Sequence, residues 1–167
     1  MAFPALSPVV SSNPPFFQAE EAIRFSAPEI RLAIAYWVEQ DRLDLAEALV
    51  VAGLSQYPDS EDILALGALV SEVLQEWSLA QERLEQLMRI QADKVPAETM
   101  HHFVRVLRCR GAYFNAYLQS QTALAWYPEH VGLQQLYSDL KQLMESVPLK
   151  ASEVPPQAQV QEAGVGR

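Results

Sequence analysis

Apolar residues recur along the chain at helical spacing, in alanine-rich stretches that end at proline. A Tyr-Pro pair at Pro58 returns 70 residues later at Pro128. Between these pairs, Ala46, Ala80 and Ala116 each follow a large apolar or aromatic residue by three positions, at steps of 34 and 36 residues. The pattern therefore predicts amphipathic helices that are arranged in a repeat of about 34 residues.

The recurrence of alanine and proline can be explained by helix packing and by the backbone chemistry of proline. Small residues at a fixed place in each unit allow helices to approach closely, and we expect Trp77 and Tyr113 to fill the space beside them. Proline ends the second helix of a unit because it lacks a backbone N–H and restricts the residue before it. Ser26 and Glu29 form a capping-box pattern where the first unit begins. The second unit has no proline at the corresponding place, so an extended loop is predicted over 91–95.

A repeat of this length built from two helices resembles the tetratricopeptide repeat family. The resemblance spans residues 26–146 and implies hairpins over 27–60, 61–96 and 97–130, followed by a capping helix over 130–146. The fold class that it implies is all-α, a right-handed superhelical solenoid of three helix hairpins plus a C-terminal helix.

In this family, the first helix of each hairpin lines a concave groove that receives an extended or helical peptide. Carried over to this chain, the resemblance assigns nine residues to the groove: Arg31, Ala35, Val38, Ala65, Leu69, Glu72, His101, Arg105 and Arg108. The implied groove is apolar in its first two thirds and basic in its last third. A protein partner with an apolar anchor and an acidic flank would complement it. The alternative is that Arg105 and Arg108 are solvated and paired with nearby acids.

The family also has a cluster of Lys, Asn and Arg that grips the terminal carboxylate of heat-shock chaperones, and this cluster is not matched here. The residues at the corresponding places are Arg31, Ala35, Leu66, Glu98 and His102. Only one of them is a basic residue of the required kind, so we do not expect a carboxylate clamp.

Composition restricts the partners further. The 167 residues carry a net charge of −9, which argues against a general nucleic-acid binder, and half of them are apolar, which suits one domain with a continuous core. No apolar run approaches the roughly 20 residues that cross a bilayer. Residues 1–10 contain no Lys or Arg and so lack the positive region of a secretory signal. The single cysteine, Cys109, suits a reducing compartment, and a cytoplasmic location is predicted.

The sequence gives little support for catalysis or for a metal site. His101 and His102 lie near Cys109, but adjacent histidines point about 100° apart on a helix and cannot both ligate one ion with that cysteine. The chain has no glycine-rich phosphate loop, no Gly-x-Ser-x-Gly elbow and no His-Glu-x-x-His motif. The tryptophans, Trp126 included, are assigned to core or inter-repeat packing. No catalysis, cofactor or metal is therefore predicted.

Both ends of the chain differ from the middle. Segments 1–25 and 147–167 are rich in proline and short of core residues, so they are predicted to be disordered tails. The exception is a set of apolar residues in the first tail: Phe16, Phe17, Ile23 and Phe25. They form either a short helix that packs against the first repeat or a segment through which two copies dimerise.

The predicted function is a non-catalytic adaptor or chaperone that binds another protein in the groove. Two alternatives stay open. By architecture, the chain also resembles the small tetratricopeptide chaperones of bacterial type III secretion. In the other alternative it is a structural subunit of an envelope or secretion assembly, docked through a convex face that includes Gln75, Arg83 and Gln86.

Overall fold

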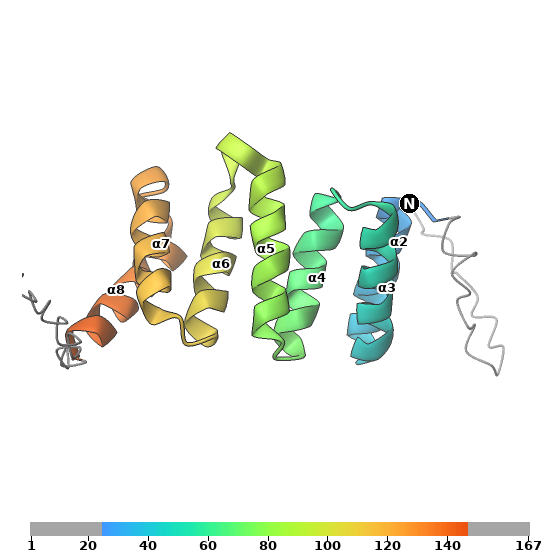
Figure 1. The fold of residues 1–167 in the computed structure, drawn as a ribbon, viewed down its shortest axis with the longest axis horizontal. Coiled ribbons are helices and arrows are strands. Elements are labelled where there is room, and N and C mark those ends of the chain that lie inside the picture. Colours follow the sequence, from blue (N-terminus) through green and yellow to red (C-terminus); the bar gives the residue numbers. More distant parts are fainter. Residues whose placement is uncertain (1–24, 147–167) are drawn as a thin grey trace, which may run out of the picture.

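The computed structural model describes residues 25–146, which form seven α-helices and one short 3-10 helix, with no strand in that range. The elements are α2 (Ala27–Glu39), α3 (Leu43–Gln56), α4 (Glu61–Val73), α5 (Trp77–Gln91), η1 (Ala92–Lys94), α6 (Ala97–Cys109), α7 (Tyr113–Trp126) and α8 (Val131–Ser146). They follow one another along the long axis of the molecule, from α2 and α3 at one end to α7 and α8 at the other (Figure 1). The predictions for both tails lie outside the described residues, except at Phe25.

Consecutive helices pack as hairpins: α2 with α3, α4 with α5, and α6 with α7, while α8 packs against α7. Each hairpin also packs against the next, through α3 with α4 and α5 with α6. The prediction of an all-α solenoid of three hairpins plus a C-terminal helix is confirmed. Among the described residues, no helix combines the length and the apolar character that a membrane span requires.

The repeated alanines form the centre of this packing. Ala46, Ala80 and Ala116 are completely buried, as their spacing predicts. The aromatic residues beside them behave differently, because Tyr113 and Trp126 are exposed. The prediction that both serve as packing residues is therefore wrong, whereas Trp77 is half-buried. Larger residues such as Leu64, Leu84 and Leu107 surround the buried alanines instead.

The turn inside each hairpin uses the same backbone conformation. Asp41, Gln75 and Gly111 have φ values of 56°, 61° and 84°, at the same steps of 34 and 36 residues as the alanines. The amide of the residue after each of them donates to the carbonyl five residues back, as Ala112 does to Leu107 at 2.9 Å. This hydrogen bond is the mark of a helix that ends in a left-handed residue. This recurrence is not evident from the sequence, because only the third turn has glycine at the left-handed position.

Replacing Gly111 with alanine should lower the free energy of unfolding by about 1 kcal/mol, the usual cost of forcing an L-residue into the left-handed region. A Cβ atom at this position would meet no other heavy atom within 4 Å, so the cost comes from backbone strain alone. Urea denaturation followed by circular dichroism measures it. Gly111→Asn should cost less, since asparagine tolerates this conformation, and equal losses would argue against the explanation.

The recurring Tyr-Pro pairs join the end of a hairpin to its beginning. The Tyr57 hydroxyl donates to the carbonyl of Phe25 at 3.0 Å, and the Tyr127 hydroxyl donates to the carbonyl of Val95 at 2.6 Å. Both bonds connect residues that are 32 positions apart. In the first and third units, a tyrosine after the second helix is therefore hydrogen-bonded to the backbone just before the first helix.

The second unit has no such tyrosine and ends differently. Ala92 adopts a φ of 47°, and the chain continues in the short helix η1 rather than in the extended loop that was predicted over 91–95. Val95 follows and is buried against Met100, Ala123 and Leu133. The short helix η1, followed by Val95 and the N-cap residue Pro96, therefore forms the connection to the third hairpin.

Candidate binding groove on the inner face

An apolar hollow lies between α2 and α4, the first helices of the first two hairpins. We call the face formed by α2, α4, α6 and α8 the inner face. The hollow measures about 250 Å³ and is lined by Ala35, Val38, Glu39, Leu66, Leu69, Val70 and Val73. Leu69 and Val73 remain 43% and 59% exposed, although they belong to a helix that is otherwise well buried. The small side chain of Ala35 leaves room opposite them.

Three of the nine residues assigned to the groove line this hollow, namely Ala35, Val38 and Leu69. Ala65 instead packs against the buried core that runs from α4 to α8. Arg31 is exposed and lies 3.6 Å from the carboxylate of Asp62, which joins α2 to α4. Of the residues assigned to the first two helices of the groove, the structure thus brings three together at the hollow and places Ala65 against the neighbouring core.

Four lining residues were not assigned to the groove: Glu39, Leu66, Val70 and Val73. A signal for one of them exists in the sequence. Val73 follows Leu69 by four positions, which places both on the same side of a helix. Extending the assigned positions by one helical turn would have found it.

A cluster of polar residues lies next along the inner face, between α4 and α6. Arg105 donates from Nη2 to both oxygens of Glu72, at 2.8 and 3.1 Å, and His102 Nε2 contacts the same carboxylate. Glu72 and His102 are largely buried. Because a buried carboxylate needs a compensating charge, the main role of Arg105 here is to neutralise Glu72.

Two neighbouring histidines of α6, His101 and His102, have lowered pKa values. Burial, followed by the nearby charge of Arg105, lowers the pKa of His102 to about 4. Burial and the neighbouring His130 lower the pKa of His101, whose ring centroid is 5.5 Å from that of His130. A neutral His102 can donate its Nε2 proton to Glu72. Within the described residues, no group of three or more His, Cys, Asp or Glu is arranged to hold a metal ion.

The last assigned residue, Arg108, lies 3.3 Å from Asp139 of α8, and both side chains are partly exposed. Together with the pair of Arg105 and Glu72, this contact changes the expected character of the groove. The third of the face that was expected to be basic is a series of ion pairs, so the alternative stated for Arg105 and Arg108 describes their surroundings better.

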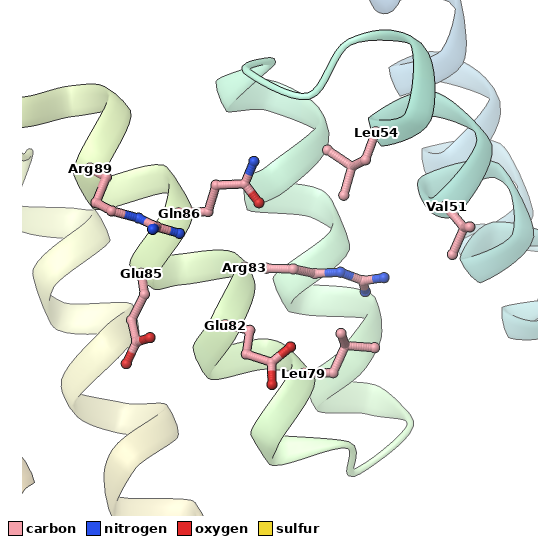
Figure 2. Close-up of a pocket in the computed structure, with 8 residues that line it drawn as sticks. All are labelled: Val51, Leu54, Leu79, Glu82, Arg83, Glu85, Gln86 and Arg89. Atoms are coloured by element: carbon pink, nitrogen blue, oxygen red, sulfur yellow. The ribbon is translucent and has the colours of Figure 1, made fainter.

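A second hollow lies on the opposite side, between α3 and α5. It measures about 450 Å³ and is lined by Val51, Leu54, Leu79, Glu82, Arg83, Glu85, Gln86 and Arg89. Figure 2 shows the Arg83 side chain extending from α5 toward the side where Val51 and Leu54 lie. Five of its eight lining residues carry charged or amide groups, compared with one of seven in the hollow on the inner face.

Arg83 was expected to be an exposed residue of the convex face, and this expectation is wrong. Its side chain is 6% exposed and donates to Glu47 of α3 at 2.9 Å, to the Gly67 carbonyl at 2.8 Å and to Ser71 Oγ at 2.6 Å. The signal in the sequence is that Arg83 follows the packing residue Ala80 by three positions and so shares its helix face. Arg83 is a structural residue that joins three helices.

Comparison with solved structures places this arrangement among known domains. The first tetratricopeptide domain of Spaghetti (RPAP3), bound to the HSP90 peptide SRMEEVD, has a TM-score of 0.64 at 12% identity, covering 72% of this chain and 94% of that one. The second such domain of human RPAP3, in complex with the HSP70 peptide SGPTIEEVD, has a TM-score of 0.61 at 13% identity, covering 74% and 98%. MamA MSR-1 C2 has a TM-score of 0.63 at 16% identity, covering 77% and 78%.

At these identities the likeness concerns the fold alone. No protein-family model matches the sequence, and no curated protein matches it. The chain has the tetratricopeptide repeat fold, in agreement with the resemblance in the sequence.

Proposed function

We propose that this chain, having the tetratricopeptide fold, is a non-catalytic module that binds another protein. Its inner face receives an apolar side chain or helix ridge of the partner in the hollow between α2 and α4. The observation that carries the proposal is the exposure of Leu69 and Val73 beside a hollow lined almost wholly by apolar residues. Apolar side chains in a concave site are the usual anchors of a protein interface.

The charged residues elsewhere on the inner face favour one orientation of the bound partner. Arg108 and Asp139 are both exposed by more than two fifths, and an ion pair of this kind contributes little to stability. A carboxylate of the partner could replace Asp139 at small cost. Arg105 is less available because it neutralises the buried Glu72. The acidic flank expected from the sequence is therefore proposed to act through Arg108.

The kind of peptide differs from those bound by the two RPAP3 domains. Ala35 and Leu66, which stand at two places of the missing carboxylate clamp, line the apolar hollow. Arg31, at a third place, is paired with Asp62. An apolar surface cannot compensate a terminal carboxylate, so we propose that the partner contacts this face through apolar side chains.

Leu69→Glu should weaken partner binding by about 100-fold or more, because it puts an unpaired charge into the apolar hollow. The probes are peptides selected on the full chain from a random display library, with affinity measured by fluorescence anisotropy. Arg108→Glu should weaken the same peptides by about tenfold or less, and this effect should shrink with added salt. The peptide SGPTIEEVD should not bind measurably.

Matched controls come from the opposite face. Val51→Glu makes the same kind of change at an exposed apolar residue of α3, and Arg89→Glu reverses the charge of an exposed arginine of α5. Both should leave affinity and the helical spectrum unchanged. If these variants abolish binding and Leu69→Glu does not, the opposite face is the interface, and the proposal of a structural subunit takes precedence.

A further inference from the structure

Helix α7 is unusual among the helices of this acidic protein because it has no charge. The stretch 111–128 contains no Asp, Glu, Lys or Arg, whereas the chain has a net charge of −9. Two of its large apolar residues, Phe114 and Leu118, are 59% and 43% exposed. They are one helical turn apart and therefore lie on the same side of α7.

The repeat itself identifies these positions as solvent positions. Phe114 corresponds to Ser78 of α5, which lies 36 residues earlier, and to Asp44 of α3, which lies a further 34 residues earlier. Leu118 corresponds in the same way to Ala48 and Glu82. All six residues are exposed. The fold thus accepts small, polar or charged residues here, and packing within the chain does not require Phe and Leu.

Other residues of α7 pack against the rest of the chain. Ala116, Ser120 and Ala123 are completely buried, and Tyr117 stacks on Tyr137 of α8 with ring centroids 5.5 Å apart. Phe114 and Leu118 lie outside both sets of contacts. This uncharged face of α7 is also separate from the inner face, since α7 is the second helix of its hairpin.

We propose that the uncharged face of α7 binds the same face of a second copy of this chain, with the two helices antiparallel about a two-fold axis. Two copies that each carry nine net negative charges repel one another, and α7 is where they can meet without bringing like charges together. A two-fold interface needs a surface that complements itself.

The order of residues along α7 provides this complementarity. The exposed stripe is Phe114, Leu118, Gln121 and Ala125, at spacings of four, three and four. In an antiparallel pair, Phe114 of one copy lies opposite Ala125 of the other, and Leu118 lies opposite Gln121. The largest side chain thus meets the smallest, which is how helix surfaces interlock.

The size of the contact limits its strength. Helix α7 has 14 residues and is about 21 Å long, so one helix pair buries less than the roughly 800 Å² per partner of a standard stable interface. The dimer should consequently form in the micromolar range and dissociate on dilution.

Sedimentation velocity of the full chain over a concentration series tests the proposal. The parent should shift from monomer to dimer across the micromolar range. The double variant Phe114→Ser with Leu118→Glu gives α7 the residues that α5 carries at these positions, so its helical spectrum should be unchanged. Its self-association should be weakened by about 100-fold or more. Ala48→Glu adds the same charge at the corresponding position of α3 and should leave the dimer intact.

A mixing experiment tests the antiparallel arrangement. Leu118→Glu and Gln121→Lys should each weaken self-association, and an equimolar mixture of the two should recover it, because the new acid then faces the new base. A mixture that associates no better than its components would overturn this arrangement. A parent that stays monomeric throughout would overturn the proposal, and its co-sedimentation with phosphatidylcholine vesicles would then assign the face to a lipid surface.

Discussion

Arg83→Met is expected to lower the free energy of unfolding by about 3 kcal/mol. The change keeps most of the apolar side chain but removes the donors to Glu47, Ser71 and the Gly67 carbonyl. Breaking a buried ion pair from one side typically costs about 3–5 kcal/mol because the remaining charge is left without a partner. The lower value applies here, since the Glu47 side chain is 21% exposed and water can reach it.

Urea denaturation monitored by circular dichroism measures this loss, and the same helix offers a matched control. Arg89 is exposed, so Arg89→Met should change stability by less than about 0.5 kcal/mol. Adding Glu47→Leu to Arg83→Met should recover part of the loss, because the unpaired carboxylate is removed. Equal stabilities of Arg83→Met and Arg89→Met would mean that the three-helix junction contributes nothing.

Gly67→Ala should destabilise the protein by about 1–2 kcal/mol, even though alanine is the better helix former. A Cβ atom at this position would lie 2.6 Å from Cγ1 of Val50 and 3.2 Å from Cδ of Arg83. Val50 is completely buried and β-branched, so it cannot rotate away freely. Overpacking of this kind costs about 1–3 kcal/mol, which is partly offset by the gain of about 1 kcal/mol in helix propensity.

A double-mutant cycle tests whether Val50 causes the strain. Val50→Ala alone should also destabilise the protein, because it leaves a cavity. Combined with Gly67→Ala, it makes room for the new methyl group, so the double variant should lose at least about 1 kcal/mol less than the sum of the two single losses. Strict additivity would place the strain elsewhere.

The sequence predicted the fold well because the fold is repetitive. Ala46, Ala80 and Ala116 recur at the repeat length and are all completely buried. Helix ends at Tyr-Pro pairs are equally readable, since proline acts on the backbone locally. The turn at Ala92 and the left-handed Gln75 were missed because neither residue is glycine, the residue type that adopts positive φ most readily.

The candidate site was predicted only in part. Ala35, Val38 and Leu69 lie together at the hollow, as helical periodicity allows one to expect, because it fixes which residues share a face. Periodicity does not say which charged groups meet across neighbouring helices. The pairs of Arg105 with Glu72 and Arg83 with Glu47 join residues 33 and 36 positions apart, and no local pattern connects them.

The amino-acid sequence by itself determined the repeat, the helices and the small residues on which the hairpins pack, because these follow from short-range periodicity and from the backbone chemistry of proline and alanine. The tertiary structure decided which polar groups are buried and which apolar groups remain exposed. Arg83 became a buried junction and Phe114 became a surface residue because solvent exposure depends on the neighbouring helices that pack around each position.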